Sequence, residues 1–219
     1  MIIAFDLDGT ISDPVVGITA SINYALDKLG QPARDPRDLK AYIGPRLQDI
    51  FADLLERSDR ENIHSAITFY RERYFRVGYR ENVIYPGIKQ MLTGLVANGH
   101  TLYMATSKKT SIAKAVADFF QISKYFKNIL GCGLNRRKHE LLTRIKEIEN
   151  TNHLVMVGDR LHDMQAGKKC NCFCVGVLWG YGSREELLDA GADKVCRNPQ
   201  ELKAIIDQIH RNPIKRGRL

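Results

Sequence analysis

Short apolar runs in the first five residues and in the C-terminal two thirds of the chain are separated by helical stretches, and this pattern restricts the fold more than any other feature. The runs predicted as strands are residues 1–5, 101–105, 127–130, 153–157, 173–178 and 194–196. The stretches predicted as helices are residues 88–98, 111–120, 138–149, 164–169, 185–190 and 199–209. Strands joined by helices in this way pair in parallel, and the helices pack on both faces of the sheet. The sequence therefore predicts an α/β fold with a parallel, Rossmann-like sheet.

The first third of the chain is helical and interrupts this alternation. Apolar residues recur there at helical spacing, as in Ile18, Ile22 and Leu26, and no strand pattern appears. The block follows directly after the first predicted strand. We therefore predict an α/β core of residues 1–13 and 84–219, with an all-helical cap of residues 14–83 inserted into it.

The net charge of +8 raises the question of a nucleic-acid partner. Half of that excess lies in residues 210–219, which hold four basic residues and no acid. We expect this basic tail to be flexible, as chain ends commonly are. Because the rest of the chain shows no base-reading or stacking element, we expect no nucleic-acid partner.

Hydropathy and cysteine content indicate the compartment. No run approaches the roughly 18 apolar residues of a membrane span, and the apolar N-terminal run is cut short at Asp6, so no signal peptide is predicted. Five cysteines, an odd number, favour reduced thiols. We expect a cytoplasmic protein with no membrane partner. Cys170, Cys172 and Cys174 are interpreted as small core residues rather than metal ligands, because no CxxC pair accompanies them.

Polar residues follow several of the predicted strands, where ligands bind in parallel α/β sheets. Such residues are Asp6 and Asp8 after the first strand, Thr106, Ser107 and Lys108 after the second, Lys138 beyond the third, and Asp159 and Asp163 after the fourth. Carboxylates gathered at one edge resist burial unless a cation joins them, and Mg²⁺ suits oxygen ligands. With the metal bound, Lys138 and the Thr106 hydroxyl could hold a phosphate. One acid could then attack phosphorus, and a second acid could transfer protons.

These segments together resemble the four motifs of the haloacid dehalogenase superfamily of phosphohydrolases. They are Asp6-Leu7-Asp8-Gly9-Thr10, Thr106-Ser107-Lys108, Lys138 and Gly158-Asp159-Arg160-Leu161-His162-Asp163, and their order and spacing match over nearly the whole chain. The long helical insertion after the first motif is similar to the cap of the phosphoglycolate phosphatase-like group. So are Tyr42-Ile43-Gly44-Pro45, Tyr85-Pro86-Gly87 and Leu178-Trp179-Gly180-Tyr181-Gly182.

The resemblance implies a role for each motif residue. Asp6 would be the nucleophile that forms a phosphoaspartyl intermediate, and Asp8 the general acid and base. Mg²⁺ would be held by Asp6, by the backbone carbonyl of Asp8 and by Asp159, with help from Asp163. The phosphoryl oxygens would contact three groups: Thr106, Ser107 through its N–H, and Lys138, which we choose over its neighbours Arg136 and Arg137 because it directly precedes an apolar helix.

The sequence departs from this pattern at two places. Ser107 stands where many members have Asn, and Arg46 follows Gly44-Pro45 where relatives often have another proline. Arg46 lies in the cap, so we interpret it as a specificity residue for a second anionic group of the substrate. Tyr24 and Tyr42 are further cap candidates for the end of the substrate that carries no phosphate. Lys108 and His162 are interpreted as solvated or structural, and Trp179 and Tyr181 as packing residues.

The predicted function is a Mg²⁺-dependent phosphatase acting on a small phosphate monoester such as phosphoglycolate, a nucleotide or a sugar phosphate. A phosphosugar mutase or a pyrophosphatase would use the same residues. A phosphate-receiving signalling module also uses a strand-end aspartate, but such modules are about half this length and lack a cap. The oligomeric state stays open.

Overall fold

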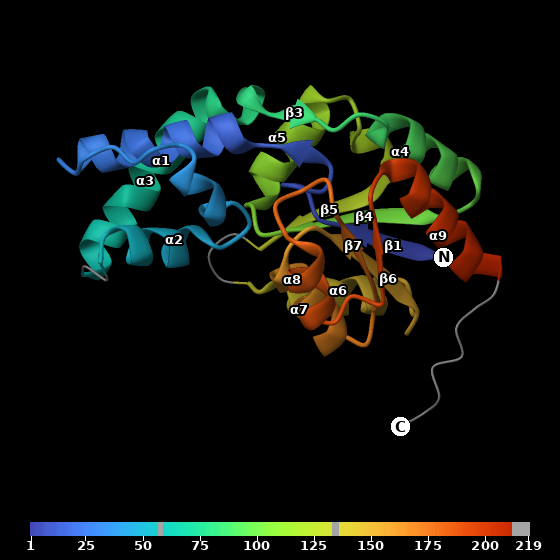
Figure 1. The fold of residues 1–219 in the computed structure, drawn as a ribbon. Helices are drawn as coiled ribbons and strands as arrows, with labels where there is room; N and C mark the ends of the chain where they lie inside the picture. Colours follow the sequence, from blue (N-terminus) through green and yellow to red (C-terminus); the bar gives the residue numbers. More distant parts are fainter. Residues whose placement is uncertain (57–58, 133–135, 212–219) are drawn as a thin grey trace.

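A six-stranded parallel sheet forms the centre of the protein (Figure 1). The computed structural model describes residues 1–56, 59–132 and 136–211. The sheet has the order β5-β4-β1-β6-β7-β8, and every neighbouring pair is parallel. Its strands are β1 (Ile2–Phe5), β4 (Thr101–Thr106), β5 (Phe126–Gly131), β6 (Leu154–Gly158), β7 (Phe173–Val177) and β8 (Lys194–Cys196). The predicted α/β fold is confirmed.

Helices cover both faces of the sheet (Figure 1). One face packs, through Ile3 and Phe5 of β1, against α4 (Ile88–Ala97), α5 (Thr110–Phe119) and α9 (Pro199–Arg211). The other face packs, through Ala4, against α6 (Lys138–Ile148), α7 (Leu161–Lys169) and α8 (Arg184–Asp189). Because successive side chains of a strand point to opposite faces, burial on both sides requires unbroken apolar runs.

The insertion after β1 is helical in its described residues. It contains α1 (Val15–Lys28), η1 (Asp38–Tyr42), α2 (Leu47–Leu54), α3 (Arg60–Arg76) and η2 (Gly78–Glu81). Figure 1 shows these helices beyond the carboxyl end of β1. A short antiparallel ribbon of β2 (Ser12–Asp13) and β3 (Val83–Ile84) joins the insertion to the core, near the boundaries that we propose for the cap. The ribbon was not predicted, because two-residue strands show no periodicity.

Several smaller predictions have definite outcomes. Within the basic tail, residues 210 and 211 end α9, and residues 212–219 lie outside the described residues. Cys172 and Cys174 are buried core residues as predicted, but Cys170 is only half-buried, at the end of α7. Helix α7 begins three residues before its predicted start. No helix in the three described ranges is both long and apolar enough to cross a membrane.

Candidate active site

The loop after β1 carries two aspartates at the carboxyl edge of the sheet. The backbone N–H of Asp6 extends the sheet pairing by donating to the Val157 carbonyl at 2.9 Å. Asp6 and Asp8 are both buried. Gly9 has a positive φ of 76°, and a Cβ there would lie 2.0 Å from Oδ2 of Asp159. Only glycine therefore allows this loop to approach the acid that follows β6.

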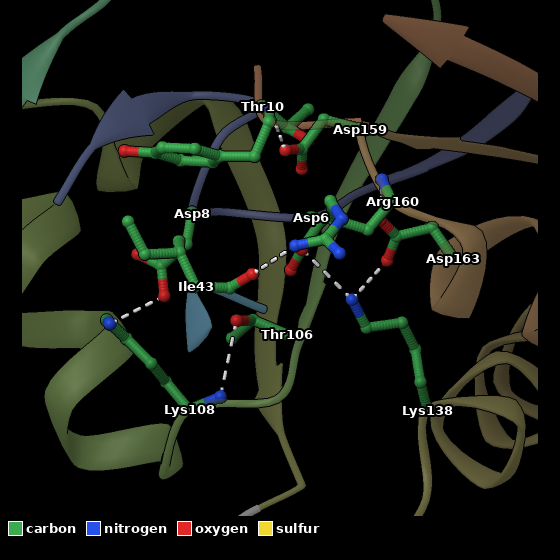
Figure 2. Close-up of polar contacts among 11 residues, drawn as sticks. Asp6, Asp8, Thr10, Ile43, Thr106, Lys108, Lys138, Asp159, Arg160 and Asp163 are labelled. Atoms are coloured by element: carbon green, nitrogen blue, oxygen red, sulfur yellow. Dashed lines mark hydrogen bonds and ion pairs between the residues drawn. The ribbon is translucent and has the colours of Figure 1, made fainter. Parts of the chain in front are cut away.

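Three buried carboxylates meet at this edge (Figure 2). Asp6, Asp159 and Asp163 each offer an oxygen, and these oxygens lie within 4.8 Å of one another. The Thr10 hydroxyl donates to Oδ1 of Asp159 at 3.2 Å, and the Tyr181 N–H donates to Oδ2 of the same carboxylate at 2.9 Å. Because both oxygens of Asp159 accept a hydrogen bond, its orientation is fixed before anything binds.

Asp163 lies in the first turn of α7 and caps the start of that helix, which therefore begins earlier than predicted. Its Oδ2 accepts the backbone N–H of Arg160 at 3.0 Å, as a carboxylate at the third helical position does in a capping box. The polar sequence of this turn concealed the helix from a periodicity argument. The turn brings Asp163 back toward the strand ends, within reach of Asp159.

Lys138 supplies a positive charge to the acid cluster. Its Nζ lies 3.0 Å from Oδ2 of Asp6 and also forms an ion pair with Asp163. Burial alone would lower the pKa of Lys138, but the carboxylates of Asp163 and Asp6 raise it, so the ammonium stays charged. The lysine chosen from the sequence, Lys138, thus contacts two of the predicted acids in the structure.

The cluster of Asp6, Asp159, Asp163 and Lys138 fits a divalent cation. Three carboxylates and one ammonium leave two uncompensated negative charges in a buried space. Burial raises the pKa of Asp6 and of Asp159, and the repulsion between neighbouring carboxylates raises both further. The buried Oδ1 of Asp6 has no hydrogen-bond partner among the described residues. A dication would neutralise the excess charge and give this oxygen a partner.

Asp8 pairs with Lys108 on the other side of the loop (Figure 2). The Lys108 Nζ lies 2.6 Å from Oδ2 of Asp8 and 4.7 Å from the ring centre of Tyr74, on cap helix α3. The Lys108 side chain is only 9% exposed, so the prediction of a solvated lysine is wrong. Burial raises the pKa of Asp8, although Lys108 opposes that shift. The second oxygen of Asp8, Oδ1, is buried without a partner in the described ranges.

Thr106 and Ser107 complete the edge between the two lysines. Thr106 ends β4, is buried, and accepts the backbone N–H of Lys108 at 3.3 Å through its hydroxyl. Ser107 lines both a small cavity of about 60 Å³ beside Asp8 and a larger cleft beside Lys138. The predicted residues of the core motifs therefore gather along one edge.

The larger cleft lies between cap and core and has a volume of about 740 Å³. Tyr42 and Arg46 line it from the cap side. The Arg46 guanidinium is engaged by Asp49, with Nε 2.9 Å from Oδ2 and Nη2 3.0 Å from Oδ1. A substrate anion at this position would therefore compete with Asp49 for Arg46.

The remaining candidates have structural partners. Tyr24 donates its hydroxyl to Glu72 on the exposed surface, at 2.8 Å. Trp179 donates Nε1 to the Thr10 carbonyl at 3.0 Å, which fits its interpretation as a packing residue. His162 lines the larger cleft, and burial lowers its pKa, as do the cations Lys138 and Arg160. Among the described residues, the group that could hold a metal ion consists of Asp6, Asp159 and Asp163 and does not include His162.

Sequence reasoning missed two side chains that reach the cap. Lys108 follows Thr106 by two residues, and only the fold shows that it turns toward Asp8. Arg160 follows Asp159 directly, and its guanidinium donates to the Ile43 carbonyl in the cap. The position of Lys108 after Thr106-Ser107 and that of Arg160 after Asp159 were visible in the sequence, but the target of each side chain on another element was not.

This fold and this edge define an α/β enzyme whose carboxylate-lined site suits a divalent cation. A family model for haloacid dehalogenase-like hydrolases matches residues 3–177. The chain belongs to this family, as its motifs indicated, and the prediction of an enzyme is confirmed.

Known relatives agree with this assignment. A 5'-nucleotidase of Pseudomonas aeruginosa is 36% identical over 210 residues, which cover 94% of this chain and 95% of that protein. A phosphoglycolate phosphatase of Vibrio parahaemolyticus is 26% identical and covers 94% of this chain and 95% of its own. The crystal structure of a "predicted phosphatase" from Clostridium acetobutylicum has a TM-score of 0.89 at 34% identity, covering 94% of this chain and 98% of that one.

Proposed function

We propose that the protein is a Mg²⁺-dependent phosphatase that hydrolyses a small phosphate monoester through a phosphoaspartyl intermediate. The observation that carries this proposal is a pair of buried carboxylates at one sheet edge, Asp6 and Asp8, each with an oxygen that has no hydrogen-bond partner among the described residues. One carboxylate is available for attack and the other for proton transfer. The names of the relatives support a phosphate substrate, because a 5'-nucleotidase and a phosphoglycolate phosphatase both act on phosphate monoesters.

The two aspartates divide the reaction between them. In the first step, an Asp6 oxygen forms a bond to phosphorus while the bond from phosphorus to the ester oxygen breaks, and Asp8 gives its proton to that oxygen. In the second step, Asp8 takes a proton from water, the water oxygen bonds to phosphorus, and the bond from phosphorus to Asp6 breaks. Inorganic phosphate leaves, and both aspartates return to their initial state.

The other residues of the edge hold the phosphoryl group. Lys138, the hydroxyl of Thr106 and the N–H of Ser107 would bind its oxygens. Asp6 and Asp159, with Asp163 beside them, would hold Mg²⁺, which shields the negative charge that otherwise repels an attacking carboxylate. Lys138 also keeps Asp163 in place through their ion pair.

A substrate panel tests the proposed function directly. Nucleoside monophosphates, phosphoglycolate, sugar phosphates, pyrophosphate and para-nitrophenyl phosphate are incubated with the protein and Mg²⁺, and released phosphate is measured. We expect release from at least one monoester. Conversion of a sugar phosphate to its isomer without release would indicate the mutase instead, and release from pyrophosphate alone would indicate the pyrophosphatase. No turnover of any compound would contradict the proposal.

Metal removal gives a second test. EDTA should abolish phosphate release, and excess Mg²⁺ should restore it, because without the cation the carboxylate cluster repels the phosphate and disfavours the ionised form of Asp6. Added Ca²⁺ should inhibit, since it takes more ligands at looser distances than an octahedral Mg²⁺ site. Full activity in the chelator would rule out this metal site.

Arg46 provides a test of the cap. Replacement by alanine should lower kcat/KM for a substrate with a second anionic group by roughly 5- to 150-fold, or about 1–3 kcal/mol, since a charged hydrogen bond is lost. Para-nitrophenyl phosphate should change little. The matched variant Asp49→Asn weakens the competing ion pair and should raise kcat/KM for the substrate with a second anionic group. Equal losses on both substrates in Arg46→Ala would show that Arg46 only supports the fold.

A further inference from the structure

The side chain of Arg160 connects the acid-bearing loop of the core to the cap (Figure 2). Arg160 immediately follows Asp159, and its Nη1 donates to the backbone carbonyl of Ile43 at 2.8 Å. Ile43 follows η1 and precedes α2, so it belongs to the cap loop that lines the larger cleft. The proposed chemistry uses neither the guanidinium nor this carbonyl, and the contact therefore needs its own explanation.

Glu186 holds the core end of the guanidinium. Its Oε1 accepts the Nε of Arg160 at 2.9 Å and the backbone N–H of Leu161 at 2.8 Å. Glu186 itself is fixed in the first turn of α8, where its N–H donates to the Ser183 hydroxyl at 3.1 Å. Both groups are sheltered, with side-chain exposures of 15% for Arg160 and 24% for Glu186. The salt bridge therefore aims the outer edge of the guanidinium at the cap.

Gly44 lets the cap loop come close to this arginine. Its φ is +108°, a region that favours glycine, and a Cβ there would lie 3.3 Å from Cγ of Arg160. The preceding residue, Ile43, is fully buried, so its carbonyl is held in place by packing. The acceptor on the cap and the donor on the core are thus both oriented by their own surroundings.

Arginine is the residue type that this contact requires. Its planar guanidinium offers Nε to one acceptor and Nη1 to another in a fixed geometry. Arg160 uses the first for Glu186 and the second for the Ile43 carbonyl. Its backbone N–H also donates to Asp163. One residue thereby contacts the cap loop, α8 and the acid cluster.

We propose that Arg160 is a positioning residue that clasps the cap loop of residues 43–46 to the acid loop of residues 158–163. The clasp holds Arg46 and its neighbours over the cleft that leads to Lys138. It acts through the Ile43 carbonyl and does not touch the reacting atoms. The clasp itself stands on contacts within the chain, whereas its effect on turnover rests on the proposed function.

Hydrogen–deuterium exchange measures the clasp without any substrate. In Arg160→Met, which keeps an apolar stem, exchange of backbone amides in residues 38–54 should rise by roughly 10- to 150-fold, the size expected for a lost hydrogen bond from a charged group. Glu186→Ala should produce a similar rise, because the guanidinium loses its anchor. Arg144→Met is the matched control: it removes an exposed arginine from α6 and should leave these amides unchanged.

The outcomes separate the clasp from a general loss of stability. Unchanged exchange at residues 38–54 in Arg160→Met would overturn the proposal, as would an equal rise in β1 and α9. If Arg160→Met does not fold, Glu186→Ala decides by the same criteria.

Kinetics adds a second readout, in which KM for a substrate that contacts the cap should rise more than kcat falls. If the wild-type protein hydrolyses nothing, the proposed function fails, but the exchange result still decides the clasp.

Discussion

Asp6→Asn should leave a folded protein with phosphate release at or near background. The amide is close in size to the carboxylate but does not attack phosphorus, so the phosphoaspartyl intermediate cannot form. Burial and the neighbouring Asp163 raise the pKa of Asp6 although Lys138 opposes them, which means that the folded chain without metal disfavours the ionised form. Removing this charge should therefore leave the thermal stability of the metal-free protein unchanged or raise it.

Two measurements give the Asp6 result its meaning. Mass spectrometry of acid-quenched enzyme should find a phosphoryl group on the peptide that contains Asp6 in the wild type and none there in the variant. Asp27→Asn, which changes an exposed aspartate of α1, serves as the matched control and should keep full activity. More than a few per cent of wild-type turnover in Asp6→Asn would defeat the nucleophile assignment.

The core of the site could be predicted because each strand end is recognisable from the local sequence, and the carboxyl ends of parallel strands meet at one edge of the sheet. Asp6 follows β1 and Asp159 follows β6, and these strands are hydrogen-bonded neighbours. Parallel strands place such residues at one edge whatever their separation along the chain. Lys138 could be chosen over Arg136 and Arg137 because it directly precedes an apolar helix. These predictions needed only the strand pattern and the direction of the chain.

The contacts between cap and core could not be predicted in the same way. The sequence around Lys108 is typical of a solvated lysine at the start of a helix. Its burial depends on the position of α3, which places Tyr74 beside it. Arg160 reaches a backbone carbonyl, an acceptor that every residue carries, so no sequence signal distinguishes Ile43. The pairing of Arg46 with Asp49 follows helical spacing of three residues and could have been anticipated. Side chains that act across elements thus need the structure.

Asp8→Asn should lower turnover of an alkyl phosphate by roughly 10²–10⁴, the usual loss when a general acid and base is removed. An alkoxide leaves poorly without a proton, and asparagine cannot supply one. Para-nitrophenyl phosphate should lose less in its first step, because nitrophenolate leaves without protonation. This difference separates the loss of proton transfer from the loss of the ion pair between Asp8 and Lys108. Loss of the ion pair would lower the rate of the first step equally for both substrates.

The pH dependence of the same variant fixes the sign of the effect. Burial raises the pKa of Asp8, and Lys108 only partly opposes the shift, so the protonated acid persists to higher pH than for an exposed aspartate. Where cleavage of an alkyl ester limits the rate, the wild-type rate should fall as the pH rises through this pKa. Asp8→Asn should lack that fall, since its side chain does not titrate. A pH–rate profile identical in shape to that of the wild type would remove the Asp8 side chain from the proton transfer and leave it only the ion pair with Lys108.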